Sequence, residues 1–445
     1  MKTKSVKMAS ADELIFKIMN RKAEIGIIGL GYVGLPLAMA LSEAGFKVTG
    51  YDISKEKIKL LNAGKSDIDD IPDKQVKSAV ESGNFRATDE PKSIAQMDVL
   101  SICVPTPLSK TKDPDVRYIL AAVDWVKKYF KRGALVILES TTYPGTTQEL
   151  IQPLLEERGM TCGQDFFLAF SPERVDPGNP KFHTVNTPRV VGGITPSCTK
   201  VAKIFYEQTI TAVCAVSSTQ AAEMVKLLEN TFRSVNIGLV NETALMCERL
   251  GIDVWEIIDA ASTKPFGFMP FYPGPGLGGH CIPIDPHYLS WKLKSLNYYA
   301  RFIELAGEIN SKMPEYVVER IMGLLNRKSA RSLNKTNILV LGVAYKRDIK
   351  DLRESPALDV IKLLEDKGAK VVYNDPYVPV FNWKGGKFKS TKLTEAVVKK
   401  ADLVVILTDH TDYNYQWVVD HAKLIFDSRN ATKKVTKNRQ KIEVL

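Results

Sequence analysis

The sequence EIGIIGLGYVGLPLAMALSEAGFKVTGYDIS, residues 24–54, has the pattern of a strand, a glycine-rich turn, a helix and a second strand. The turn is Gly29-x-Gly31-x-x-Gly34. In such a turn the first glycine permits the sharp bend, the second lets a pyrophosphate approach the main chain, and the third lets the helix pack against the strand. The stretch therefore predicts a βαβ unit that binds a dinucleotide.

An acidic residue, Asp52, ends the second strand about 18 residues after the last glycine of the turn. Its carboxylate would accept hydrogen bonds from both adenosine ribose hydroxyls and would repel a 2′-phosphate. This favours NAD over NADP. Lys55 and Lys57 leave the alternative open, because either ammonium could meet the additional phosphate.

The composition is that of a globular protein. A chain of 445 residues with 44% hydrophobic and 25% charged residues should form two or three domains. Its apolar runs have the length of strands, so no membrane span is predicted. Residues 1–22 lack the continuous apolar segment of a signal peptide and predict a short amphipathic helix. The six cysteines show neither disulfide nor metal-ligand spacing, which indicates free thiols in a reducing cytoplasm and no metal site.

The formal net charge is +10, but the lysines are dispersed along the chain. No block of Lys and Arg alternates with aromatic residues, so the charge does not indicate a nucleic-acid-binding protein. A solvated basic surface is the simplest interpretation, and anionic, phosphate-bearing ligands are the alternative.

The first domain continues with three further apolar strands. They are predicted at residues 99–107, 134–141 and 166–173. In a doubly wound sheet the carboxyl ends of the strands face the ligand, so Thr106, Thr141 and Glu173 are site candidates by position. The alternatives are helix or turn capping by the threonines and a surface ion pair between Glu173 and Arg174.

Residues 219–250 show helical spacing over a length that suits a helix linking domains or pairing subunits. Lys226 and Asn230 stand four residues apart and so share one face, with Glu223 a turn before them. The alternative is an ordinary solvated helix face.

The stretch GPGLGGHCIPIDPH, residues 274–287, places Cys281 among glycines with Asp285 four residues later. Glycines let a substrate approach the main chain and offer N–H groups to a developing oxyanion, and a nearby carboxylate can orient a lysine or a water. The stretch therefore predicts a nucleophilic cysteine. A Gly/Pro-rich turn that holds a buried thiol is the alternative.

The C-terminal part has a second α/β pattern. A helix running into a polar linker is predicted at 314–336. After it, strands are predicted at 337–346, 370–378, 401–410 and 423–429, and a helix is predicted at 355–370. This part lacks the three-glycine turn. In its place stands AYKRDIKDLRESP, where Lys346, Arg347 and Arg353 could meet a phosphate with their side chains.

Five ordered motifs carry a family resemblance. They are IGLGYVGLPLA, SPERVDPGN, Lys226-x-x-x-Asn230, GPGLGGHCIPIDP and AYKRDIKDLRESP. From residue 24 to the C-terminal end the chain resembles the UDP-sugar 6-dehydrogenases, which oxidise the hydroxymethyl group of the sugar to a carboxylate and use NAD twice. The resemblance implies an α/β protein with two Rossmann-like doubly wound domains, joined by a long central helix and a helical dimerisation region, that forms a homodimer and supplies a uronic acid for a surface polysaccharide.

The corresponding division of the chain has four parts. They are an N-terminal extension (1–22), an NAD-binding domain (23–215), a central helical dimerisation domain that contains the cysteine loop (216–325) and a UDP-sugar-binding domain (326–445).

The family chemistry explains the cysteine. Two hydride transfers are needed to convert the alcohol to the acid, so the aldehyde must be held while the first NADH leaves. Cys281 would capture the aldehyde as a thiohemiacetal, and a second hydride transfer would give a thioester that water hydrolyses. The implied catalytic residues are Cys281, Lys226, Asp285, Asn230, Glu173 and Thr141.

These residues have different implied roles. Lys226 and Asn230 would stabilise the developing oxyanion. Asp285 would hold Lys226 or the attacking water. The base is left open between Glu173 and a water near Thr141.

The resemblance also implies two sets of binding residues. The cofactor set is Gly29, Gly31, Tyr32, Val33, Gly34, Asp52, Thr106, Thr141 and Arg353. The substrate set is Glu173, Arg174, Lys226, Asn230, Phe271, Tyr272, Gly274, Gly278, Lys346 and Arg429.

The substrate prediction depends on one departure from the glucose-specific members. Those members usually have PEFLxEG where this chain has SPERVDPG, with Arg174 in the run. The form present here, followed by KPFGFMPFYPGPGLGGHC, resembles members that oxidise UDP-N-acetylhexosamines, especially UDP-N-acetyl-D-glucosamine. UDP-N-acetyl-D-mannosamine is the close alternative, and UDP-glucose is a further one.

Two other classes of protein share parts of this pattern. A non-catalytic nucleotide-sugar sensor would have no need of Cys281, Lys226 and Asp285, all of which are present. A hydroxyacid dehydrogenase with a single oxidation step shares the first domain and the long helix but has no use for the cysteine.

Overall fold

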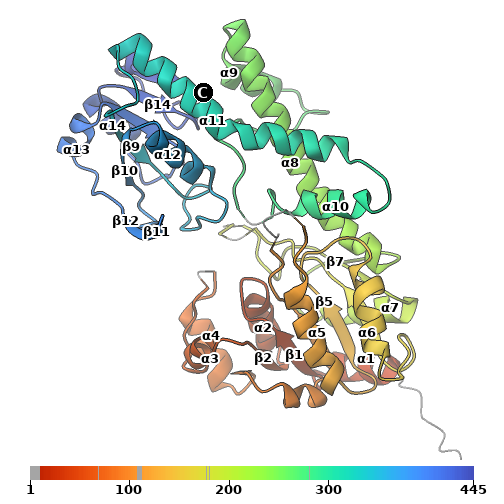
Figure 1. Ribbon diagram of the computed structural model, residues 1–445. Coiled ribbons are helices and arrows are strands. Elements are labelled where there is room, and N and C mark those ends of the chain that lie inside the picture. The colour runs from red at the N-terminus through yellow and green to blue at the C-terminus, as the bar shows by residue number, and fades with distance from the viewer. Residues whose placement is uncertain (1–10, 69, 108–112, 177, 180, 280) are drawn as a thin grey trace, which may run out of the picture. The chain divides into compact units, whose positions relative to one another are not determined.

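The structure, a computed structural model, describes residues 11–68, 70–107, 113–176, 178–179, 181–279 and 281–445. The chain divides into two compact units (Figure 1). One unit contains residues 1–229 and 287–297, and the other contains residues 230–286 and 298–445. The two units are described separately below.

The first unit is built on a sheet with the strand order β3-β2-β1-β4-β5-β6-β7-β8. Its strands are β1 (Glu24–Ile28), β2 (Lys47–Tyr51), β3 (Phe85–Thr88), β4 (Val99–Ile102), β5 (Leu135–Leu138), β6 (Phe167–Phe170), β7 (Arg189–Gly193) and β8 (Val213–Ala215). All neighbouring pairs are parallel except β6 and β7. The chain reverses its direction of winding between β1 and β4, which is the position where doubly wound sheets bind ligands.

Helices surround this sheet. They are α1 (Ala11–Met19), α2 (Gly34–Glu43), α3 (Lys55–Asn62), α4 (Asp73–Glu81), α5 (Arg117–Tyr129), α6 (Gln152–Glu156) and α7 (Pro196–Tyr206), with the short turns η1 (Pro91–Gln96) and η2 (Thr146–Ile151). Every residue of β4, β5 and β6 is buried, as expected for parallel strands covered on both faces. Within the N-terminal extension, the predicted amphipathic helix is confirmed over Ala11–Met19, where α1 buries Leu14 and Ile18 and packs against α7. Residues 1–10 of the extension lie outside the described residues.

The second unit contains the helical region. Its helices are α9 (Val254–Ala261), α11 (Arg301–Ser329) and parts of α8 (Thr219–Leu250) and α10 (Asp285–Lys294). The predicted helix 219–250 is confirmed as α8. The helix predicted at 314–336 is wrong in its bounds, because α11 begins at Arg301 and continues through the buried Pro314. A proline removes only one main-chain hydrogen bond, so it does not mark the start of this helix.

The C-terminal part of the second unit is a parallel sheet with the order β10-β9-β13-β14-β15. Its strands are β9 (Asn337–Leu341), β10 (Lys370–Asn374), β13 (Leu403–Ile406), β14 (Ile425–Asp427) and β15 (Ile442–Val444), and β11 (Val380–Trp383) pairs with β12 (Gly386–Lys389) as a separate hairpin. The helical elements are α12 (Pro356–Asp366), α13 (Glu395–Lys400), α14 (Tyr415–His421) and η3 (Arg439–Lys441). This is the second common order of doubly wound folds, so the prediction of two Rossmann-like domains is confirmed.

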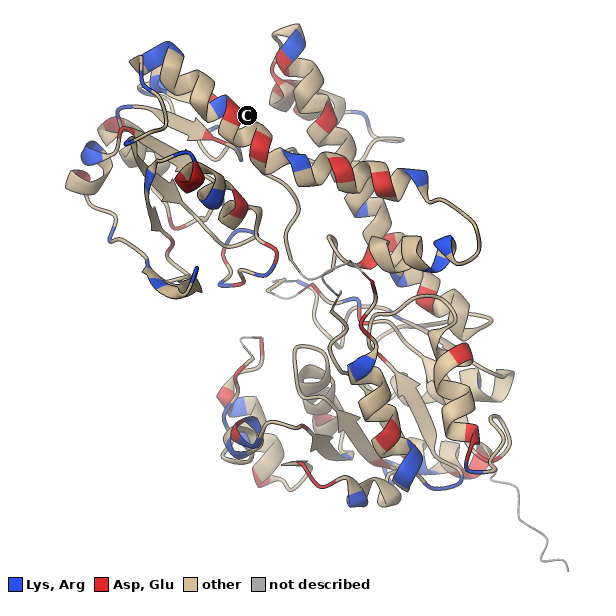
Figure 2. Cartoon of the chain, viewed as in Figure 1, with Lys and Arg blue, Asp and Glu red and all other residues tan. Residues whose placement is uncertain are grey.

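Charged residues are spread over both units. Figure 2 shows Lys and Arg intermixed with Asp and Glu, most clearly along α11, rather than gathered on one element. Among the helices that the structure describes, none has the length and apolar character needed to span a membrane.

Candidate active site

The glycine turn leads from β1 into α2. Gly29 has a φ of 92°, and a Cβ at this position would lie 2.7 Å from the carbonyl oxygen of Cys103. A Cβ at Gly34 would collide with the carbonyl of Gly29. Around Gly31, in contrast, no described atom lies within 4 Å of the position of a Cβ. The turn is therefore closed toward the protein and open at Gly31, where a pyrophosphate would approach.

The acidic residue after β2 is held beside this turn. Asp52 accepts hydrogen bonds from the main-chain N–H groups of Leu30 (3.0 Å) and Ser54 (2.9 Å). Lys57 donates to the carbonyl of Leu30 (3.2 Å) and pairs with Asp67 (2.9 Å). The charge of Lys57, which reaches the turn at Leu30, is thus compensated by a carboxylate, and the arrangement fits NAD.

The remaining cofactor candidates of the first unit lie, like the glycine turn, at the carboxyl ends of the strands of its sheet. Tyr32 and Val33 occupy the turn before α2, and Tyr32 is exposed. Thr106 follows β4, is buried, and its carbonyl accepts a hydrogen bond from the hydroxyl of Tyr288 (2.8 Å). Thr141 follows β5. Because β1, β4 and β5 are neighbours in the sheet, these residues meet at the carboxyl ends of adjacent strands.

The proposed ion pair between Glu173 and Arg174 is wrong. The guanidinium of Arg174 instead pairs with Glu229 on α8 (2.5 Å) and donates to the carbonyl of Pro188 (2.6 Å). The carboxylate of Glu173 pairs with Arg189 (3.0 Å). The two neighbours in the sequence point in different directions, so their adjacency did not indicate their partners.

Lys226 on α8 is buried, with 7% of its surface exposed, and its ammonium donates a hydrogen bond of 2.6 Å to the main-chain carbonyl of Glu173. Glu223, one turn earlier, is 1% exposed. It accepts hydrogen bonds from the N–H groups of Gly145 (2.6 Å) and Thr147 (2.9 Å). Burial raises the pKa of Glu223 to about 7. The alternative of a solvated helix face is therefore wrong for this part of α8.

Two of the catalytic candidates meet in the second unit. Asn230 on α8 donates a hydrogen bond of 2.6 Å to the carboxylate of Asp285, and both side chains are buried. The N–H group of Asp285 in turn donates to the carbonyl of Cys281 (2.8 Å). Cys281 is partly exposed, whereas four of the other cysteines are buried. The chain from Asn230 through Asp285 to Cys281 fixes the cysteine turn relative to this part of α8.

The glycine loop before Cys281 packs against the C-terminal sheet of the same unit. Its first glycine, Gly274, donates from its N–H to Asn241 (3.0 Å), and a Cβ there would collide with the guanidinium of Arg429. A Cβ at Gly278 would lie 2.5 Å from the Cβ of Tyr345. The N–H of Gly279 donates to the carbonyl of Arg353 (2.9 Å). Glycines at these positions allow the two loops to touch.

Two predicted binding residues of this unit, Phe271 and Tyr272, pack against side chains of α8 and α9. The ring of Phe271 packs against Phe232 on α8, with centroids 5.8 Å apart. Tyr272 stacks on Trp255 of α9 and donates its hydroxyl to Asp259 (2.7 Å). The remaining candidates lie near the glycine loop: Lys346 stands over the ring of Tyr345, and the guanidinium of Arg353 pairs with Asp351 (2.6 Å).

Sequence reasoning missed three residues that support the site. They are Glu139, Arg189 and Asn241, all buried. Arg189 opens a strand whose residues are all buried, and Glu139 directly follows another. A charged residue at the end of a buried strand is a signal that was available in the sequence.

A dinucleotide turn beside an acidic strand end, a cysteine loop held to a long helix, and a second doubly wound domain together define an NAD-dependent dehydrogenase of nucleotide sugars. The chain belongs to the UDP-glucose/GDP-mannose dehydrogenase family, since its residues match the NAD-binding domain of that family (23–210), the central domain (220–312) and the UDP-binding domain (339–434).

Individual relatives cover nearly the whole chain. The UDP-N-acetyl-D-mannosamine dehydrogenase of Pyrococcus horikoshii is 37% identical over 92% of this chain and 96% of its own, and a solved structure of this enzyme superposes with a TM-score of 0.83. The NDP-N-acetyl-D-galactosaminuronic acid dehydrogenase of Ralstonia nicotianae is 36% identical over 87% of this chain and 91% of its own. The structure of a UDP-glucose dehydrogenase from Pyrobaculum islandicum has a TM-score of 0.79 at 26% identity, with coverage of 95% and 96%.

Proposed function

We propose that this protein oxidises the 6-hydroxymethyl group of a UDP-N-acetylhexosamine to a carboxylate through covalent intermediates on Cys281. NAD accepts one hydride in each of the two oxidations. The observation that carries the proposal is the hydrogen-bonded chain from Asn230 through Asp285 to the main chain of Cys281, because it ties the turn of a partly exposed cysteine to two buried polar side chains.

The proposed reaction proceeds in three balanced steps. The alcohol loses a hydride and a proton and becomes an aldehyde. The sulfur of Cys281 forms a bond to the aldehyde carbon while the C=O π bond opens and the thiol proton passes to the carbonyl oxygen. The resulting thiohemiacetal loses a second hydride from this carbon and the proton of its hydroxyl group to give a thioester. A water molecule then adds to the thioester carbon, the C–S bond breaks, and the acid leaves with the thiol restored.

The charges that develop on the substrate oxygen require donors. The ammonium of Lys226 and the amide of Asn230 are the proposed donors, and each is already held by an acceptor of its own unit, the carbonyl of Glu173 and the carboxylate of Asp285. Such pre-oriented donors stabilise an oxyanion without reorganisation during the reaction. Asp285 is proposed to orient Asn230 and, in the hydrolysis step, the attacking water.

Of the two bases left open by the sequence, a water near Thr141 is the better proposal. Both carboxylate oxygens of Glu173 are engaged: one accepts from Arg189, and the other accepts from the main-chain N–H groups of Arg174 and Val175. Taking up a proton there would remove the negative charge that strengthens the bond to Arg189.

The substrate proposal combines the sequence motifs with the named relatives. The motifs favoured UDP-N-acetyl-D-glucosamine, whereas several relatives at 34–38% identity are named as UDP-N-acetyl-D-mannosamine dehydrogenases. Their names make the mannosamine epimer at least as good a candidate. We therefore propose a UDP-N-acetylhexosamine as the substrate, with UDP-N-acetyl-D-mannosamine tested first.

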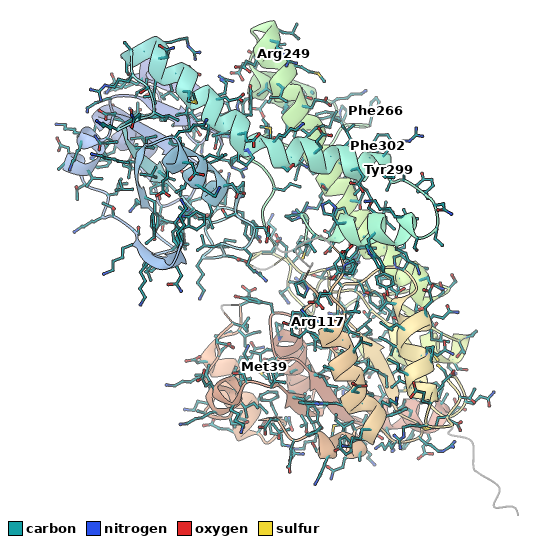
Figure 3. All side chains as sticks on the ribbon, in the orientation of Figure 1. Met39, Arg117, Arg249, Phe266, Tyr299 and Phe302 are labelled. Carbon is teal, nitrogen blue, oxygen red and sulfur yellow. The ribbon has the colours of Figure 1, made fainter. Side chains whose placement is uncertain are left out.

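We further propose that the protein is a homodimer joined through its helical region. Apolar side chains stand exposed on the helices and loops of the second unit, and Figure 3 labels three of them. These are Phe266 (71% exposed), Tyr299 and Phe302 (77% exposed). Where such side chains form a contiguous apolar patch, the patch marks an interaction surface. Light scattering of the purified protein measures the mass, and a monomer at micromolar concentration would contradict the dimer.

One experiment tests the reaction and the substrate together. The purified protein is given UDP-N-acetyl-D-mannosamine, UDP-N-acetyl-D-glucosamine and UDP-glucose separately, and NADH is counted per sugar consumed. Two NADH per sugar with one of the two acetylated sugars supports the proposal and selects the epimer. One NADH per sugar would contradict the thioester route, and preference for UDP-glucose would contradict the proposed substrate class.

A further inference from the structure

The guanidinium of Arg189 joins two carboxylates in the interior of the first unit. Arg189 is the first residue of β7, and its side chain is 3% exposed. It donates to Glu139 (2.5 Å) and to Glu173 (3.0 Å). Burial alone would lower the pKa of Arg189, but the two carboxylates raise it above its ordinary value. A guanidinium carries its donors in a rigid fork, so it sets the separation of the two acids.

Glu139, Arg189 and Glu173 form a charged bridge, and three elements of the fold anchor its Glu139 end. Besides Arg189 on β7, the carboxylate accepts hydrogen bonds from the hydroxyl of Ser101 on β4 (2.5 Å) and from that of Tyr206 on α7 (2.6 Å). Burial and the charge of Glu139 raise the pKa of Tyr206, so its hydroxyl keeps the proton that it donates. The position of the guanidinium is therefore fixed from the core of the sheet.

The other end of the bridge fixes the turn that holds Lys226. One carboxylate oxygen of Glu173 accepts from Arg189, and the other accepts from the N–H groups of Arg174 and Val175, each at 2.8 Å. The main-chain carbonyl of the same Glu173 accepts the hydrogen bond from the ammonium of Lys226. The place of that carbonyl thus depends on how the carboxylate is anchored.

We propose that Arg189 is a positioning residue for Lys226 and that it acts through Glu173. This inference rests on the proposed function, in which the ammonium of Lys226 faces the developing oxyanion. Lysine has a long flexible side chain, so the carbonyl that receives its hydrogen bond decides where its charge stands. A displacement of about 1 Å in a catalytic group can lower a rate by roughly 100-fold. The side chain of Glu173 is an anchor in this arrangement.

The substitution Arg189→Lys tests the proposal, because an ammonium keeps the charge but cannot hold two carboxylates in the geometry of a guanidinium. We expect kcat to fall by roughly 10- to 100-fold and the pH–rate profile to shift, while the KM for NAD stays within about threefold. An unshifted profile with kcat within about twofold of the wild type would overturn the proposal.

A second readout does not need turnover. Acetic anhydride labels lysines at rates that mass spectrometry resolves residue by residue. In the Arg189→Lys variant Lys226 should be labelled severalfold faster than in the wild type, and the exposed Lys200 should be labelled equally in both. Equal labelling of Lys226 would overturn the proposal. If the wild type oxidises no nucleotide sugar, the proposed function fails, whereas this labelling still reports on the positioning of Lys226.

Loss of stability needs its own control. Phe130 is buried in the same unit, just after the end of α5, and Phe130→Leu should lower the melting temperature without lowering kcat. If both variants lose the same share of kcat at equal melting temperature, the role of Arg189 is structural and the proposal is wrong. If Arg189→Lys does not fold, Glu139→Gln replaces it, because this change weakens the hydrogen bond that anchors Arg189. Unchanged labelling of Lys226 in Glu139→Gln would then overturn the proposal.

Discussion

Asn230 and Asp285 form a buried hydrogen bond of 2.6 Å that links α8 to the first residue of α10. The next link is main-chain: the N–H of Asp285 donates to the carbonyl of Cys281. This side-chain pair therefore helps to hold the turn of Cys281 to α8, and the proposed chemistry can be tested at the pair without changing the sulfur.

The substitution Asp285→Asn should lower kcat by roughly 10- to 100-fold. An amide can still accept a hydrogen bond from Asn230, but it lacks the charge that strengthens that bond and that would draw a water toward the thioester. NADH formation under saturating substrates measures the change. Asp366→Asn is the matched control, because Asp366 lies in the same unit and pairs with Lys362 on the exposed face of α12. Equal kcat for Asp285→Asn and the wild type would remove Asp285 from the mechanism.

Replacing the nucleophile separates the two oxidations. In Cys281→Ser the hydroxyl is a far weaker nucleophile than a thiolate, so the steady-state rate of acid formation should fall by at least about 1000-fold. In the wild type, mass spectrometry of the quenched enzyme should find the sugar nucleotide attached to the peptide of Cys281. The exposed Cys214 supplies the control, since Cys214→Ser should leave the rate unchanged. Full turnover of Cys281→Ser to the acid would contradict the covalent route.

The parts of the structure that follow from local pattern could be predicted from the sequence. The turn at Gly29 and the long helix α8 are examples, because strand and helix periods and the positions of glycines are readable over short stretches. The start of α11 could not be predicted, since the internal Pro314 looks like a helix boundary.

The partners of the buried charged residues could not be predicted from the sequence, for a different reason. Arg189 meets Glu173 because β6 and β7 run antiparallel and bring the segments that flank them together. Asn241 meets Gly274 because a helix and a loop distant in sequence pack in one unit. Such pairings depend on the register and packing of the whole fold, so neighbours in the sequence, such as Glu173 and Arg174, gave the wrong partner.

Cofactor choice should depend on Asp52. Removing its charge with Asp52→Asn weakens the acceptor for the ribose hydroxyls and lowers the repulsion of a 2′-phosphate. We expect kcat/KM for NAD to fall by roughly 10-fold and the ratio of NADP to NAD use to rise. Steady-state rates with each cofactor give the ratio. Asp67→Asn is an informative comparison, because it uncovers the charge of Lys57, which should also raise NADP use if that ammonium reaches the phosphate. No change in the ratio for Asp52→Asn would contradict its assigned contact.

The stability of the first unit should depend on pH through Glu223. Its pKa of about 7 in the folded protein lies above its ordinary value of 4.5, because burial disfavours the charged form. Between about pH 4.5 and about pH 7 the carboxyl group of Glu223 is ionised in the unfolded chain but stays protonated in the folded chain. The free energy of unfolding therefore falls as the pH rises from about 4.5 to about 7, by about 3 kcal/mol from this group, and is constant above that range.

The variant Glu223→Gln removes this titration and should flatten the dependence. Its amide offers only one oxygen to the N–H groups of Gly145 and Thr147, so at about pH 5 the variant should be less stable than the wild type by about 1–3 kcal/mol. The difference should narrow by about pH 8, where the wild type has lost the stabilisation of its neutral acid. Thermal melting across this range measures both curves. The exposed Glu207 gives the control, since the stability of Glu207→Gln should depend on pH in the same way as that of the wild type. If the difference in stability between Glu223→Gln and the wild type stays constant with pH, the raised pKa of Glu223 is contradicted.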